Sequence, residues 1–170
     1  MRILGIDPGS QNVGFGVIDV QSEKLRYVEH GVIQLKAKEE FLSRMKTLGA
    51  RMDELLSRFQ PQILVIEKAF VGKNVDSAFK LGHARGICIY LAMNRGALVA
   101  EYAPREIKKG ITGSGAAEKD QVATCVQALL GLRTLDSVSF DATDALAMAV
   151  HHAHVLEQQI RLDPRRFLDR

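Results

Sequence analysis

The chain is poor in cysteine and has no long apolar run. Its two cysteines, Cys88 and Cys125, lie far apart without C-x-x-C spacing, which excludes a disulfide framework and gives no sign of a zinc site. We expect both to be small core side chains. No apolar segment approaches membrane-spanning length, and the run after Met1 is far too short for a signal peptide. These absences predict a cytoplasmic protein that makes no membrane contact.

Charge of one sign is not in large excess either. The formal net charge is +3 at pH 7, which permits a polyanionic partner without requiring one, because total charge does not say where the charges cluster. Internal repeats, low-complexity tracts and inter-domain linkers are also lacking. The 170 residues, 46% of them hydrophobic, therefore predict one globular domain over residues 1–158, followed by a loose basic tail over 159–170.

The spacing of apolar residues predicts an α/β fold. The expected elements, in chain order, are strands over 2–7, 13–20 and 24–35, a helix over 39–59, a strand over 63–67, a helix over 75–94, a strand over 97–102, a short basic helix after Pro104, a helix within 117–130, and a last helix from about 140 to 159. Three consecutive strands followed by strands that alternate with helices predict a mixed sheet flanked by helices.

One predicted helix is apolar beyond a single face. The second half of the helix over 75–94 reads ICIYLAM, which is apolar on all sides. Such a segment must be covered on more than one side, either by the core of the protein or by another subunit.

Acidic residues stand at the ends of two predicted strands. The first strand runs into the segment GIDPGS, and a tight turn with a capping carboxylate accounts for Asp7 taken alone. Glu67 ends the strand ILVIE, which a helical crossover would place beside the first strand and parallel to it. A charged strand end that reaches solvent or pairs with Lys68 is an equally good interpretation of Glu67 alone.

Two further acids open the last predicted helix. Asp141 and Asp144 are spaced i, i+3 and lie on one helix face. One of them is explained as an N-cap, because acids in a first turn gain from the helix dipole. A cap does not explain the second acid, which precedes an apolar stripe that turns the same helix end toward the core.

The four carboxylates together suit a pair of magnesium ions. Nearby carboxylates repel and raise one another's pKa unless a cation lies between them. Magnesium prefers oxygen ligands and leaves positions for water and substrate phosphate, and two such ions can activate water and stabilise the leaving oxygen of a phosphodiester. The combination of positions therefore predicts nuclease chemistry.

Long segments of the sequence resemble the RuvC-type Holliday junction resolvases of the ribonuclease H-like nucleases. The segments are GIDPGS, FQPQILVIEKAF, KNVDSAFKLGHARG, GSGAAEKDQV and DATDALAMAVHHAH. The resemblance implies a ribonuclease H-like five-stranded mixed sheet, in which three antiparallel strands precede the parallel ones. It also implies a homodimer that cuts four-way DNA junctions by paired symmetric nicks, in recombination and repair. Mg²⁺ is the implied cofactor, with two ions per site and Mn²⁺ as a substitute, and a branch-migration motor complex is left open as a partner.

Site residues follow from the same resemblance. The family's acidic tetrad falls on Asp7, Glu67, Asp141 and Asp144, as metal ligands and catalytic residues. Lys119 matches a basic residue near the scissile phosphate, although a solvated lysine paired with Glu118 or Asp120 would look the same.

The resemblance and local charge also indicate residues that bind DNA. Phe70 matches an aromatic residue that stacks on a base, although a lone loop phenylalanine is more often buried. The basic residues expected to hold the phosphate backbone, each of which is alternatively plain surface, are Lys73, Lys80, Arg85, Arg105, Lys108 and Lys109. The helix over 75–94 resembles the family's dimer helix. We interpret His151, His152 and His154 as structural.

Three other function classes remain open at this stage. One is a different ribonuclease H-like nuclease, and another is a junction-binding module without catalysis. The third is an actin-like or sugar-kinase-like ATP-binding phosphotransferase, which also opens on an apolar strand, an acid and a glycine-containing turn. Such ATPases need two copies of the fold and a second glycine-rich phosphate loop, and this sequence has neither.

Overall fold

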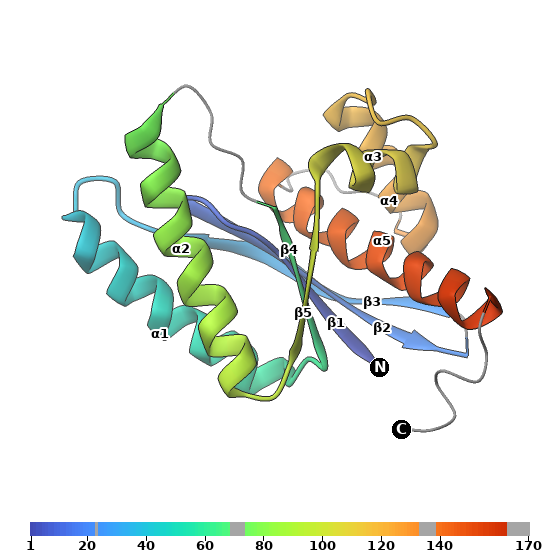
Figure 1. Ribbon diagram of the computed structural model, residues 1–170, viewed down its shortest axis with the longest axis horizontal. Coiled ribbons are helices and arrows are strands. Elements are labelled where there is room, and N and C mark those ends of the chain that lie inside the picture. Colours follow the sequence, from blue (N-terminus) through green and yellow to red (C-terminus); the bar gives the residue numbers. More distant parts are fainter. Residues whose placement is uncertain (23, 69–73, 133–138, 163–170) are drawn as a thin grey trace.

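The computed structural model describes residues 1–162 except 23, 69–73 and 133–138. Its elements in chain order are β1 (Arg2–Asp7), β2 (Asn12–Gln21), β3 (Lys24–Gln34), α1 (Phe41–Phe59), β4 (Ile63–Glu67), α2 (Val75–Asn94), β5 (Leu98–Tyr102), α3 (Pro104–Thr112), α4 (Lys119–Leu130) and α5 (Phe140–Leu162), as Figure 1 shows. All the predicted elements are present, with small shifts at their ends. Because α5 continues to Leu162, it extends past the predicted domain boundary at residue 158, and that boundary stays a prediction.

The five strands form one mixed sheet in the order β3-β2-β1-β4-β5. Neighbours are antiparallel from β3 to β1 and parallel from β1 to β5, which confirms the predicted topology. Because β1 and β4 run parallel in the centre of the sheet, their carboxyl ends lie at the same edge.

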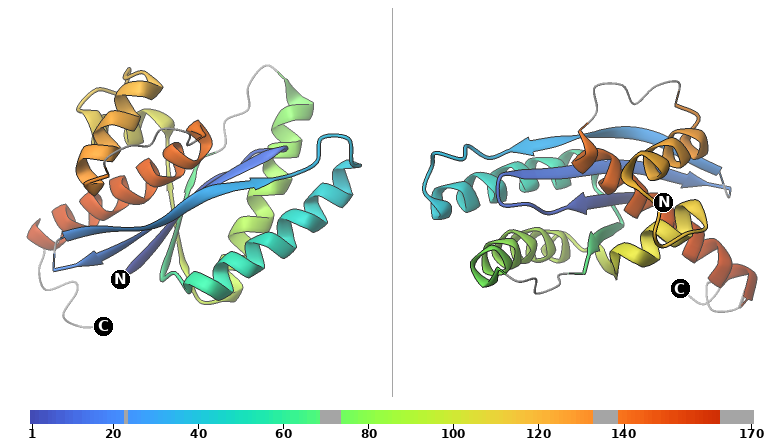
Figure 2. Two further views of the ribbon diagram at one scale, coloured as in Figure 1. Left: turned by 180° about the vertical axis from the view of Figure 1, so that it is seen from behind. Right: turned by 90° about the horizontal axis from the view of Figure 1, so that it is seen from above.

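Helices cover both faces of the sheet (Figures 1 and 2). Helices α1 and α2 lie on one face, and α5 lies across the other face with α3 and α4 beside it. Side chains alternate along the strands, so Leu4 and Ile6 belong to the core under α1, whereas Ile3 and Val65 belong to the core under α5. Burial on both faces explains why β4 reads as a continuous apolar run.

Glycines in the sheet bring α5 unusually close to it. A Cβ atom on Gly5 would lie 1.9 Å from the carbonyl oxygen of Ala145, and one on Gly14 would lie 2.0 Å from that of Asp141. No side chain fits in so little space, so the backbone of α5 rests directly on β1 and β2. The first turns of α5 are thereby fixed against the strand end that carries Asp7.

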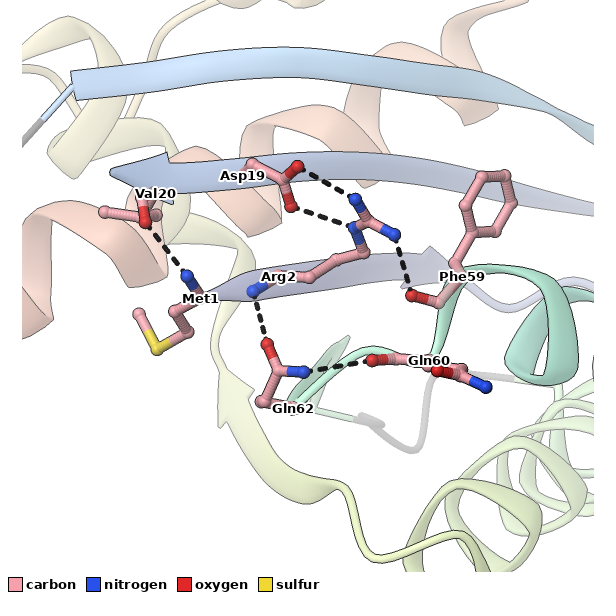
Figure 3. A network of polar contacts seen from close by, with 7 residues as sticks. All are labelled: Met1, Arg2, Asp19, Val20, Phe59, Gln60 and Gln62. Carbon is pink, nitrogen blue, oxygen red and sulfur yellow. Dashed lines mark hydrogen bonds and ion pairs between the residues drawn. The ribbon is translucent and has the colours of Figure 1, made fainter.

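The amino-terminal end of β1 is fixed by a network of polar contacts (Figure 3). Arg2 donates from Nε and Nη2 to the two carboxylate oxygens of Asp19, at 2.8 and 2.9 Å, and from Nη1 to the carbonyl of Phe59. The amide of Arg2 also donates to the side chain of Gln62. These contacts tie β1, β2 and the end of α1 together at the edge opposite Asp7.

Helix α2 buries only a narrow face in this chain. Its buried residues are Ala84, Cys88 and Ala92, whereas the side chains of Phe79, Tyr90 and Met93 are 66%, 63% and 61% exposed. In the second half of this helix Ile87, Ile89 and Leu91 are partly buried against the core, whereas Tyr90 and Met93 stay exposed. A second subunit as the cover of this exposed face stays a prediction.

The structure shows where the two cysteines lie and how apolar the helices are. Cys88 is buried, Cys125 is partly buried, and both are free thiols. No helix among the described residues combines the length and the apolar character needed to cross a membrane.

Candidate active site

Two of the predicted site residues end neighbouring strands. Asp7 is the last residue of β1 and Glu67 is the last residue of β4. The parallel register pairs Ile6 with Ile66, so the two acids follow directly at the same edge of the sheet. The crossover predicted from the sequence is confirmed, and it brings these carboxylates side by side.

The other two acids come from the start of α5. Asp141 and Asp144 lie in its first two turns, and the carbonyl of Asp141 rests on Gly14. Gly14 is the residue of β2 that pairs with Asp7. Close packing of the helix on this glycine therefore sets the distance between the acids of α5 and the end of β1.

A cleft of about 390 Å³ joins these elements. It is lined by Asp7, Glu67, Pro104, Ile107, Lys108, Lys119, Val122, Asp144, Ala147 and Met148. Three acids and two lysines thus face a shared space whose other walls are mostly apolar. Asp141 is not one of the lining residues, but its charge acts on Asp7 as described next.

Burial and nearby negative charge raise the pKa of two acids of the cleft. The pKa of Asp7 rises from 3.8 to about 7, chiefly through burial and further through nearby negative charges. These charges are, in decreasing order of effect, Asp144, Glu67 and Asp141. Burial and the charge of Asp144 also raise the pKa of Glu67. The four predicted acids therefore form one electrostatic cluster, in which negative charge is poorly tolerated without a cation.

Lys119 supplies one positive charge to the cluster. Its Nζ donates to Asp144 Oδ2 at 2.9 Å and lies 5.8 Å from the centre of the Phe140 ring. The hydrogen bond to Asp144 raises the pKa of Lys119. Its ion-pair partner is thus an acid of the cleft, and neither of the neighbouring acids that the sequence offered as partners is paired with it.

The donor set of the cleft suits magnesium. Among the residues that the structure describes, no three histidine, cysteine, aspartate or glutamate side chains stand close enough to enclose one ion by themselves. Magnesium does not require such a cage, because it is commonly held by one or two carboxylates and keeps several water ligands. An open cleft that presents only carboxylate oxygens, with mutual repulsion that a cation would relieve, fits such an ion.

Comparison with known proteins identifies the family. The sequence model of the family described as "Crossover junction endodeoxyribonuclease RuvC" matches residues 3–152. The chain belongs to the RuvC family. A RuvC of Bdellovibrio bacteriovorus is 47% identical over 157 residues, which cover 92% of each chain. Membership sets aside the alternatives of an actin-like ATPase and of a sugar-kinase-like ATPase.

Solved structures of the RuvC family have the same fold. The Thermus thermophilus RuvC structure matches with a TM-score of 0.84 and 33% identity, covering 94% of this chain and 97% of the other. A T. thermophilus RuvC in complex with a Holliday junction substrate matches with a TM-score of 0.83 and 30% identity, over 93% and 96% of the two chains. The ribonuclease H-like sheet predicted from the sequence is therefore confirmed.

The residues predicted to bind DNA are spread over several environments. Phe70 and Lys73 lie outside the described residues. Lys108 lines the cleft, and Arg105 and Lys109 are exposed on the same helix, α3.

Two other predicted DNA contacts have partners within the chain. Lys80 forms an ion pair with Asp76, one helical turn away. Arg85 donates from Nε to the carbonyl of Glu67 at 3.1 Å and forms an ion pair with Glu101. The partly buried arginine is thus held against the ends of β4 and β5.

Sequence reasoning missed a residue that holds the turn after Asp7. Arg44 is buried, and its Nη1 donates to the carbonyl of Ser10 at 2.6 Å. It therefore fixes the segment that follows the end of β1. The available signal was a charged residue next to Met45, on the face of the helix that is otherwise apolar.

Two of the three histidines of α5 lie within the fold, and His154 is partly exposed. His151 and His152 are buried, and His152 Nδ1 pairs with the hydroxyl of Tyr102 at 2.7 Å. Burial lowers the pKa of His152 to about 4. Their packing against the end of β5 agrees with the structural role that the sequence suggested.

Proposed function

We propose that this protein is a metal-dependent endonuclease that resolves four-way DNA junctions by paired symmetric nicks, in recombination and repair. The observation that carries the proposal is the convergence of Asp7, Glu67 and Asp144 in one cleft of a RuvC-family fold. A relative with the same fold has been solved with a Holliday junction substrate, which supports the same substrate class here. Such junctions are met in the cytoplasm of bacteria, and we propose that the protein acts there.

Each acid has a role in this proposal. Asp7, Glu67, Asp141 and Asp144 hold two Mg²⁺ ions, for which Mn²⁺ can substitute. When bound, two such ions supply an activated water and stabilise the leaving oxygen of the phosphodiester. Asp7 and Glu67 are held by the sheet, and the two aspartates of α5 are held by its close packing on Gly14. The site is therefore rigid on both sides, as a catalyst that must position several ligands requires.

The basic residues act on the phosphate. Lys119 already carries its charge within the acid cluster, so it can offset negative charge that builds up on the scissile phosphate. Lys108 faces the same cleft and would contact a phosphate there. Arg105 and Lys109 lie on the exposed side of α3 and would follow the DNA backbone beyond the cleft. Lys73 and Lys80 are proposed as further contacts to the backbone. Phe70 is proposed to stack on a base at the crossover.

The chain is further proposed to act as a homodimer through α2. Phe79, Tyr90 and Met93 leave an apolar face of this helix uncovered, and a hollow of about 360 Å³ lies beside Phe79, lined by Val75, Ala78, Phe79, Gly82 and His83. Exposed apolar patches of this kind mark interaction sites. A two-fold dimer would present two clefts to a nearly symmetric junction, which explains why the nicks are paired. A branch-migration motor complex as a partner stays a prediction.

The decisive experiment uses a synthetic four-way junction with labelled strands. Purified protein is incubated with the junction in Mg²⁺, in Mn²⁺ or in chelator, and the cuts are mapped. We expect symmetric nicks near the crossover that depend on the metal. Random degradation of linear duplex would instead indicate another type of ribonuclease H-like nuclease, and binding without cutting would indicate a junction-binding module.

The dimer has a separate test. Phe79→Asp places a charge on the uncovered face of α2, at a residue that does not line the acid cleft, and we expect a monomer by analytical ultracentrifugation. The monomer should lose paired nicking. An unchanged dimer would show that another surface joins the subunits.

A further inference from the structure

The side chain of Arg85 links α2 to the strand that carries Glu67. It is 19% exposed, although it lies near the middle of a helix that leaves most of its surface open. Its Nε donates to the backbone carbonyl of Glu67 at 3.1 Å, and its Nη2 pairs with the carboxylate of Glu101 on β5. One guanidinium therefore joins α2, β4 and β5 at a single point.

This point is where β4 ends. The amide of Lys68 donates to the carbonyl of Tyr102, which is the last backbone contact between the two strands among the described residues. The Glu67 carbonyl is held by the arginine of α2 instead of by a neighbouring strand. Because the carboxylate of Glu67 and this carbonyl belong to the same residue, a shift of the carbonyl also moves the carboxylate in the cleft.

Arginine is suited to this task and lysine is not. The two acceptors are approached by different nitrogens of one planar group, whereas a lysine has a single nitrogen at the end of a flexible chain. Polar groups that orient a metal ligand in this way affect metal affinity without touching the metal.

We propose that Arg85 is a positioning residue, which holds the Glu67 carboxylate in the cleft and couples its position to helix α2. This inference rests on the proposed role of Glu67 as a metal ligand. It is an alternative to the expectation that Arg85 contacts DNA, because its Nε and Nη2 are engaged within the chain. The contacts of Arg85 also connect α2 to the cleft. Binding of another subunit to the exposed face of α2 would therefore help to fix the position of the metal ligands.

The test compares Arg85→Gln and Arg85→Lys with a matched control, Arg95→Gln. Arg95 stands just after the end of the same helix and pairs with Asp53 of α1, outside the residues that line the cleft. Binding of Mn²⁺ is measured by titration calorimetry without DNA, and junction affinity is measured in chelator. We expect both Arg85 variants to weaken Mn²⁺ binding by about 10-fold, the usual effect of losing an outer partner of a metal ligand. Cleavage should fall at low Mg²⁺ and recover at high Mg²⁺, while junction affinity and the control variant stay at the wild-type level.

Several results would overturn the inference. Unchanged Mn²⁺ binding in both variants would do so, as would a loss of junction affinity with intact metal binding, which would return Arg85 to the DNA interface. Full rescue by Arg85→Lys would show that charge matters and geometry does not. If the Arg85 variants fail to fold, Glu101→Gln removes one of the two anchors from a half-exposed side chain. A folded Glu101→Gln protein with wild-type Mn²⁺ binding would then overturn it.

A further variant separates this inference from the proposed function. Glu67→Gln should itself lose Mn²⁺ binding. If it does not, Glu67 is not a ligand and the proposed site fails, whatever Arg85 does. If it does and the Arg85 variants bind normally, only the inference about Arg85 fails.

Discussion

The two ends of strand β1 provide opposite environments for a carboxylate. At the amino-terminal end the Asp19 carboxylate receives two hydrogen bonds from Arg2, which lower its pKa (Figure 3). At the carboxyl end Asp7 is buried beside further acids, and its pKa rises to about 7. The length of one six-residue strand therefore separates a charge that stabilises the fold from a charge that is unfavourable to it. Sites that bind or react commonly depart from the rules that stabilise the rest of a protein.

The largest effect is expected from Asp7→Asn. Cleavage should fall below detection while the junction is still bound, because a proposed metal ligand is lost and the surface for DNA is kept. The same change should stabilise the metal-free protein at pH 8 by on the order of 2 kcal/mol. It removes a carboxylate whose negative charge is unfavourable in the folded protein, as its raised pKa shows. Activity assays and thermal melts in chelator measure both effects. Full activity would contradict the assignment of the site.

The raised pKa of Asp7 also predicts how the stability of the metal-free protein changes with pH. The pKa of Asp7 is above its ordinary value in the folded protein, so binding a proton stabilises the fold. The metal-free wild type should therefore lose stability as pH rises from about 4 to about 7, and this slope should be weaker in Asp7→Asn. An equal slope in both proteins would show that Asp7 is not the titrating group.

Lys119→Gln should have the next largest effect. Losing a positive group that faces a developing charge typically slows a reaction by about 10²- to 10³-fold. Lys119 also lowers the pKa values of Asp7 and Glu67, so its loss should move the acid limb of the pH–rate profile to higher pH. Single-turnover cleavage across pH measures both. A slower rate with an unmoved limb would mean that the lysine acts on the phosphate alone.

Gly14→Ala tests how the acids of α5 are positioned. The new methyl group would lie 2.0 Å from the carbonyl oxygen of Asp141, so the helix must move. We expect a loss of about 1–3 kcal/mol in unfolding free energy, together with a fall in cleavage of about 10²-fold, the effect of a small misplacement at a reacting centre. Gly49→Ala is the control, because a Cβ there has ordinary space and α1 should be stabilised. Wild-type cleavage in a folded Gly14→Ala protein would contradict this account of the site.

Asp19→Asn tests the amino-terminal end of β1, and we expect it to leave cleavage unchanged. The loss of charged hydrogen bonds to Arg2 should lower the unfolding free energy by about 1–2 kcal/mol at pH 7. The pKa of Asp19 is lowered in the folded protein, so this contribution exists above the unfolded pKa and disappears as pH falls through the folded value. Denaturant titrations at pH 7 and at acidic pH check the sign. A loss of activity would show that the two ends of β1 are coupled.

Much of the site follows from the sequence because it depends on strand ends and helix periodicity. Asp7 and Glu67 could be placed together once two central strands were expected to run parallel, and the spacing of Asp141 and Asp144 set one helix face. The sequence could not give the contacts made by long basic side chains. Arg85 contacts the carbonyl of Glu67 and the carboxylate of Glu101, and Lys119 pairs with an acid 25 residues away. Nearest neighbours in the sequence do not determine such partners, because the folded elements bring together residues from distant segments.

The raised pKa of Asp7 affects how the cleft binds a divalent ion. Since its pKa lies at about 7, close to neutrality, the metal-free protein carries this group partly protonated. A proton on Asp7 therefore reduces the negative charge of the cleft until a divalent ion binds and displaces it. Loading should acidify an unbuffered solution, and its apparent heat should vary with the ionisation enthalpy of the buffer.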